Sequence, residues 1–143
     1  KFKPKAILHT HSKNSVSISS LKKGFLEKLN QSSMRFFERV EYFDYSGMVV
    51  DEKIGKKLAS KIKKNTRIII LKNHGSIILG NSIKELFHLT FHFEKCCDIQ
   101  LSILNQKINN VSDKIARLTC NQHQGFGEVG YMSWEASKKK IKN

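Results

Sequence analysis

Three histidines stand where apolar runs of the sequence end. His9 and His11 follow the run 6–8 and are separated by one residue. His74 comes shortly after a second run, which ends at Leu71. Residues two apart on a strand point to the same face of a sheet. Three protein nitrogens with an open coordination position are typical of a catalytic zinc site. We therefore predict that His9, His11 and His74 bind Zn²⁺ or another divalent metal ion.

The residue after His74 supports this interpretation. Gly75 allows the backbone to turn sharply, so that the imidazole of His74 can lie at the edge of a sheet. A bound ion would polarise a carbonyl or hydroxyl oxygen, or it would lower the pKa of a bound water. The spacing of the ligands does not choose between these reactions, and both stay open.

Hydrophobic periodicity predicts the elements that position these histidines. Strands are expected at 6–11, 40–45, 67–71 and 76–80, with Ile7 and Leu8 buried in the first of them. Helices are expected at 51–64 and 83–105, with one or two short helices in 16–29 and another in 32–37. The segment 111–118 is a further candidate helix. Interleaved strands and helices indicate an α/β domain, and the short connection 71–76 indicates an antiparallel hairpin within it.

The long helix 83–105 carries other residues that are able to take part in chemistry. His88 and His92 are four residues apart, but the glutamate that a His-Glu-x-x-His metalloprotease uses as its base is missing between them. We interpret both histidines as ordinary residues of a helix face. Glu94 and Asp98 share one face and are expected to pair with lysines. Cys96 and its neighbour Cys97 are expected to be packing residues.

Composition limits the class of protein. The chain has 143 residues and a net charge of +14, and it contains no apolar run close to the roughly 20 residues that span a bilayer. No signal peptide is recognisable at the N-terminus, and the three cysteines do not form the pattern of a disulfide framework. Both observations favour the cytoplasm. Most basic residues are lysines, whereas base reading favours arginine. We interpret them as a solvated surface, and salt-dependent nucleic-acid binding is the less favoured alternative.

Several stretches of the sequence resemble the class II aldolase/adducin family. Residues 6–12 resemble its first metal motif, and residues 69–76 resemble its second. Residues 79–87 and 93–101 are similar to its long helix, and residues 35–47 are similar to its adducin-like branch in particular. The resemblance runs from about residue 5 to residue 101, with a weaker similarity around Trp134.

The resemblance implies a three-layer α/β/α fold around a central, largely antiparallel sheet. It also implies a zinc-dependent lyase or isomerase that acts on a small hydroxy-carbonyl substrate, a sugar phosphate, through a metal-stabilised enediolate. The metal ligands carry over to His9, His11 and His74. Members of the family commonly form homo-oligomers, typically tetramers, in which a C-terminal aromatic of a neighbouring subunit completes the site, and Tyr131 is the candidate here.

The resemblance leaves one alternative function open. We expect a single domain over 1–143 that lacks the N-terminal part of the family domain, with 107–143 as an irregular C-terminal extension. The main catalytic carboxylate of the family would then lie upstream of Lys1. A non-catalytic, adducin-like protein-interaction module is therefore the alternative to an enzyme.

Overall fold

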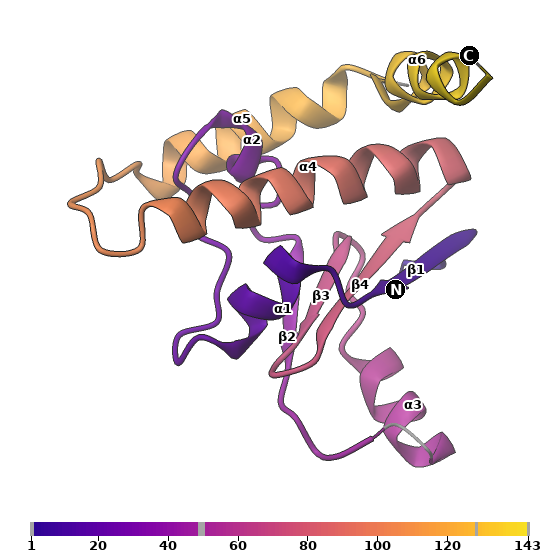
Figure 1. Cartoon of the computed structure of the whole chain (residues 1–143), viewed down its shortest axis with the longest axis vertical. Coiled ribbons are helices and arrows are strands. Elements are labelled where there is room, and N and C mark those ends of the chain that lie inside the picture. The colour runs from indigo at the N-terminus through magenta and orange to yellow at the C-terminus, as the bar shows by residue number, and fades with distance from the viewer. Residues whose placement is uncertain (1, 49–50, 128, 143) are drawn as a thin grey trace.

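Four strands form one mixed sheet at the centre of the chain (Figure 1). The computed structural model describes residues 2–48, 51–127 and 129–142. The strands lie in the order β1-β4-β3-β2, with β1–β4 and β4–β3 antiparallel and β2–β3 parallel. They are β1 (Ala6–Thr10), β2 (Val40–Phe43), β3 (Ile68–Leu71) and β4 (Gly75–Gly80). The predicted α/β class and the 71–76 hairpin are confirmed, and the sheet is mixed rather than purely antiparallel.

The alternation of side chains along β3 creates two hydrophobic layers. All four residues of β3 are buried, as expected for a β-branched run in the middle of a sheet. Ile68 and Ile70 contact one layer, and Ile69 and Leu71 contact the other. The sheet therefore needs helices on both of its faces, which is the basis of the three-layer arrangement.

The first face of the sheet is covered by α1 (Lys13–Ser20) and by α4 (Ile83–Ser102). Figure 1 shows α4 crossing this face as the longest helix of the structure. It begins at Ser82, whose hydroxyl accepts a hydrogen bond from the backbone of Glu85. Its apolar stripe includes Leu89 and Phe93, which pack with residues of the sheet in one core cluster.

The second face of the sheet is covered by α3 (Glu52–Ser60), which lies on the opposite side from α4 in Figure 1. Asp51 caps this helix by accepting a hydrogen bond from the backbone of Lys53. Ile54 and Leu58 pack against the core residues of this face, and the lysines of the helix are exposed. This helix covers the face only partly, and none of its residues is fully buried.

The C-terminal third differs from the sequence-based expectation. An irregular extension with one candidate helix at 111–118 was predicted for 107–143. The structure has α5 (Asp113–Gly125), which overlaps that candidate, and α6 (Val129–Lys142) there. Ala116 and Cys120 of α5 are buried, and Cys120 contacts the backbone next to α2 (Gln31–Met34). Trp134 of α6 contacts Phe87 of α4 at a ring-centroid distance of 5.7 Å. These anchors are small or isolated apolar residues, which give only a weak helical pattern.

Two further expectations on buried segments need correction. Ile7 is 62% exposed, because β1 is an edge strand and its second face is not covered at that position. The helical pattern expected to extend to Leu29 ends at Ser20, and a connection without regular structure follows it to Asn30. Among the described residues, no helix is long and apolar enough to cross a membrane.

Candidate metal centre

The structure brings His9, His11 and His74 together at one end of the β1–β4 pair. Their ring centroids lie 4.6 Å apart for His9 and His11, 5.0 Å for His9 and His74, and 4.7 Å for His11 and His74. One nitrogen of each imidazole lies within 4.8 Å of the others, and no other group of three or more possible ligands lies this close within the described ranges. The grouping expected from strand spacing is therefore present.

The register of the sheet orients His9. This residue pairs with Ile77 of β4, and its Nδ1–H donates a hydrogen bond to the carbonyl oxygen of Ser76 at 3.1 Å. That bond places the proton on Nδ1 and leaves Nε2 as the lone-pair nitrogen. This unprotonated Nε2 of His9 lies 2.9 Å from Nε2 of His11, within hydrogen-bond distance. A backbone carbonyl that holds the second nitrogen of a histidine is a frequent partner of metal-binding imidazoles.

The tight turn before β4 places His74. Asn73 adopts a positive φ of 55°, and its backbone N–H donates to the carbonyl of Ser19 at 3.0 Å. Gly75 has φ 155°, and a Cβ there would overlap the carbonyl oxygen of Thr10 and approach the ring of His11. Only glycine permits this close approach of β4 to the end of β1. The role of Gly75 is thus steric as well as conformational.

The surroundings of His74 favour its neutral imidazole. Partial burial lowers the pKa of His74, and the nearby His9 and His11 lower it further. Neutral imidazole is the form that binds metal ions. Two nitrogens bound to one zinc ion at about 2.0–2.1 Å lie roughly 2.9–3.4 Å apart, and the Nε2 atoms of His9 and His11 already lie at that separation. The residues present therefore fit a divalent ion.

A pocket of about 350 Å³ opens beside the histidines on the α3 side of the sheet. It is lined by His9, Met48, Leu58, His74 and Ile77. None of these described residues is a carboxylate; they supply two of the candidate ligands and apolar walls. Sequence reasoning missed Met48, Leu58 and the carbonyl of Ser76. The role of the Ser76 carbonyl could be predicted only from the correct pairing of β1 with β4.

Among the described side chains, none of the other residues singled out by sequence belongs to this cluster. Tyr131 belongs to α6, but its side chain lies outside the described part of the chain. His88 is buried against the guanidinium of Arg35, and the ring of His92 lies next to it at a centroid distance of 4.4 Å. The expected lysine partners of Glu94 and Asp98 are absent among the described ion pairs. Glu94 instead accepts a hydrogen bond from Ser12.

The sequence profile of the "Class II Aldolase and Adducin N-terminal domain" matches residues 3–101, which include all three histidines. The chain belongs to the class II aldolase/adducin family. Among curated members, mouse gamma-adducin is 31% identical over 97 residues, which cover 68% of this chain and 14% of that protein. The chain therefore spans about one seventh of this relative.

Solved structures of the family share the fold. An aldolase II superfamily protein from Pseudomonas syringae superimposes with a TM-score of 0.86 at 25% identity, over 96% of this chain and 56% of that one. L-fuculose 1-phosphate aldolase from Glaciozyma antarctica PI12 superimposes with a TM-score of 0.66 at 26% identity, over 81% of this chain and 43% of that one. The arrangement of helices around a mixed sheet is thus that of class II aldolases.

Proposed function

We propose that this chain is a metal-binding domain in which His9, His11 and His74 hold Zn²⁺ or a similar divalent ion. The observation that carries the proposal is the convergence of three imidazole nitrogens within 4.8 Å from two antiparallel strands. The unprotonated Nε2 of His9, the glycine contact behind His74 and the pocket on one side support the same assignment. Three imidazoles also accept cobalt, nickel, manganese or iron, so the identity of the ion is open to measurement.

We infer further that the domain belongs to an aldolase-like lyase or isomerase. A bound ion would supply Lewis-acid polarisation of a hydroxy-carbonyl substrate. The residues described here would hold that ion and close one side of the pocket with Leu58 and Ile77. Because no carboxylate lines the pocket, we place the general base outside the described lining residues. A phosphorylated sugar is the substrate class to test first, since one structural relative is a fuculose-phosphate aldolase.

The proposed assembly is a homo-oligomer, with a tetramer as the state to test first. The described lining residues of the pocket include no carboxylate base, which supports a site that a neighbouring subunit completes. Tyr131 stays the candidate for that contribution. The three cysteines are buried and unpaired, which agrees with a reducing compartment such as the cytoplasm.

Metal analysis of the purified protein tests the proposal directly. We expect close to one divalent ion per chain after expression in metal-supplemented medium, measured by inductively coupled plasma mass spectrometry. His9→Ala and His74→Ala should each lose most of it, because two imidazoles bind far more weakly than three. His123→Ala is the matched control, since His123 contacts the carbonyl of Gln31 and lies outside the cluster.

Two results would contradict the metal assignment. One is a parent protein without stoichiometric metal, and the other is a metal content that both ligand variants leave unchanged. Turnover of L-fuculose 1-phosphate and related sugar phosphates, lost in the same variants, would extend the assignment from metal binding to catalysis.

A second candidate function is an adducin-like protein-interaction module. It is favoured by the 31% identity to gamma-adducin over 97 residues. In that case partner capture would survive complete removal of metal by a chelator, and no sugar phosphate would be turned over. Loss of the captured partner on chelation would instead link the interaction to the histidine cluster.

A further inference from the structure

The three candidate ligands are not held equally well by the sheet. His9 lies inside the paired part of β1, and His74 lies in the turn that leads into β4. His11 comes after Thr10, the last paired residue of β1. Among the described side-chain hydrogen bonds, the only one made by His11 is its contact with His9. Its position therefore depends on what fixes the backbone beyond the end of the strand.

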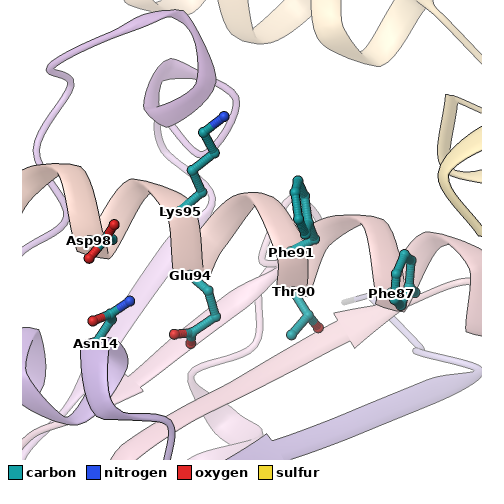
Figure 2. Close-up of a pocket in the computed structure, with 7 residues that line it drawn as sticks. All are labelled: Asn14, Phe87, Thr90, Phe91, Glu94, Lys95 and Asp98. Carbon is teal, nitrogen blue, oxygen red and sulfur yellow. The ribbon is translucent and has the colours of Figure 1, made fainter. Parts of the chain in front are cut away.

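The next residue, Ser12, connects this backbone to α4 on the other face of the sheet. Its hydroxyl donates to Oε1 of Glu94 at 2.5 Å, and it also lies 2.7 Å from the hydroxyl of Ser15. Figure 2 shows the side chain of Glu94 extending from α4 towards the sheet, in a pocket that Asn14 of α1 also lines. Glu94 thus connects the long helix to the chain segment between β1 and α1.

The geometry of α1 indicates that this contact is more than incidental. Ser12 occupies the N-cap position of α1, where a serine hydroxyl ordinarily accepts a backbone hydrogen bond. Here the side chain makes no capping bond, although the Ser12 carbonyl accepts from the backbone of Val16 at 2.9 Å. The hydroxyl is directed to Glu94 instead. A hydroxyl–carboxylate bond of this length is charge-assisted and stronger than one between neutral groups.

We propose that Glu94 is a positioning residue of the candidate metal centre, which it serves through Ser12 by fixing the backbone that carries His11. The inference rests on the proposed metal-binding function and adds a residue from the opposite face of the sheet. Glu94 does not belong to the group of possible metal ligands, so its effect on the metal passes through the serine hydroxyl and the adjacent peptide. Groups that orient metal ligands typically contribute about 10-fold to 100-fold in metal affinity.

The test measures the affinity of the full chain for Zn²⁺ by competition with a chromophoric chelator. Glu94→Ala and Ser12→Ala should each weaken binding by about 10-fold or more. The double variant should be little weaker than either single variant, because both remove the same contact. Glu94→Gln keeps an oxygen acceptor without the charge, so an intermediate affinity is expected. Asp98→Asn is the matched control, since Asp98 lies one turn further along α4 and lines the same pocket.

A second readout separates positioning from general stability. The visible spectrum of the Co²⁺-loaded protein reports the geometry of the ligands, and it should change in Glu94→Ala but not in Asp98→Asn. Should Glu94→Ala fail to fold, Glu94→Gln and Ser12→Ala carry the test. Unchanged affinity and spectrum in the Glu94 and Ser12 variants would overturn this inference alone. A parent protein that binds no metal would overturn the proposed function and this inference with it.

Discussion

Two neighbouring histidines of α4, the buried His88 and the half-buried His92, have surroundings that affect their protonation. A nitrogen of the Arg35 guanidinium is in hydrogen-bond contact with Nε2 of His88, which leaves that ring neutral. Burial and then the charge of Arg35 lower the pKa of both histidines to about 4. The Nδ1 atoms of both rings have no hydrogen-bond partner among the described residues. A proton added to either ring would therefore be buried next to a fixed positive charge.

The pair predicts a loss of stability in mild acid. The unfolded chain binds protons at these histidines from about pH 6.5, whereas the folded chain binds them only near pH 4. Because the unfolded state binds more protons in this interval, the free energy of unfolding should fall as the pH falls through it, by up to about 1.4 kcal/mol per pH unit for each histidine. Above pH 6.5 this contribution is fully present. Urea unfolding at several pH values measures the slope.

A variant of His88 checks the origin of that slope. His88→Gln keeps an acceptor for Arg35 and removes one titrating group. The slope of the free energy of unfolding against pH should therefore decrease by about one proton relative to the parent. An identical slope in both proteins would assign the acid sensitivity to other groups.

At the scale of elements, the sequence predicted most strands and helices because their patterns are strong. The uninterrupted apolar run 68–71 and the cap at Ser82 have few alternative interpretations. The parallel pairing of β2 with β3 was not predicted, because pairing direction is set by the long connection between these strands rather than by residue type. The helix α6 was not predicted. The helix α5 was predicted only as the shorter segment 111–118, because its buried residues, Ala116 and Cys120, are small and give a weak pattern.

The candidate site, like the fold, was predicted from the sequence only in part. The histidines were identified because imidazoles at strand ends are visible in a sequence. The carbonyl of Ser76 and the contact of Ser12 with Glu94 were not, since both depend on residues far apart in the chain. A backbone acceptor leaves no signal in the residue types. A glutamate on a long helix is ordinarily expected to face solvent, so its sequence position did not indicate this contact.

The β1–β4 element leads to a prediction about its glycine. Gly75→Ala should lower the free energy of unfolding by about 1–3 kcal/mol, because the added methyl group meets the Thr10 carbonyl at a positive φ. The same change should weaken metal binding, since it separates β4 from the end of β1. Urea unfolding and metal competition measure the two effects.

The matched control is Gly55→Ala in α3. A Cβ at Gly55 would meet no atom within 4 Å, so this change should raise stability by about 0.5–1 kcal/mol through helix propensity alone. Destabilisation of similar size at both glycines would contradict the steric role of Gly75.

At the scale of the whole molecule, charge is the dominant feature. The chain has 26 basic and 12 acidic residues, for a net charge of +14. All four arginines make intramolecular contacts: Arg35 and Arg39 are buried, Arg67 stacks on Phe2, and Arg117 pairs with Glu38. Most of the solvated positive charge is therefore carried by lysines, an arrangement that does not favour base recognition in nucleic acid.

This imbalance predicts that salt stabilises the fold. Repulsion among the lysines opposes the compact state, and the screening length falls from about 30 Å at 0.01 M salt to about 3 Å at 1 M. The melting temperature should therefore rise with sodium chloride, as measured by circular dichroism. The double variant Lys53→Gln/Lys64→Gln removes two charges that belong to none of the described ion pairs, so its melting temperature should depend less on salt. A melting temperature that falls with salt would show that attractive pairs dominate.

The pairing of β1 with β4 has a consequence for how the molecule opens. His9 and its partner Ser76 are 67 positions apart in the chain, so their contact closes a long loop. The entropy of closing such a loop must be met before the pairing contributes stability, and contacts of this kind form late in folding. β1 also has a neighbour on one side only. Local fluctuations of the native state should therefore release this strand before the interior of the sheet opens, and two of the three imidazoles would leave with it while most of the fold stays intact.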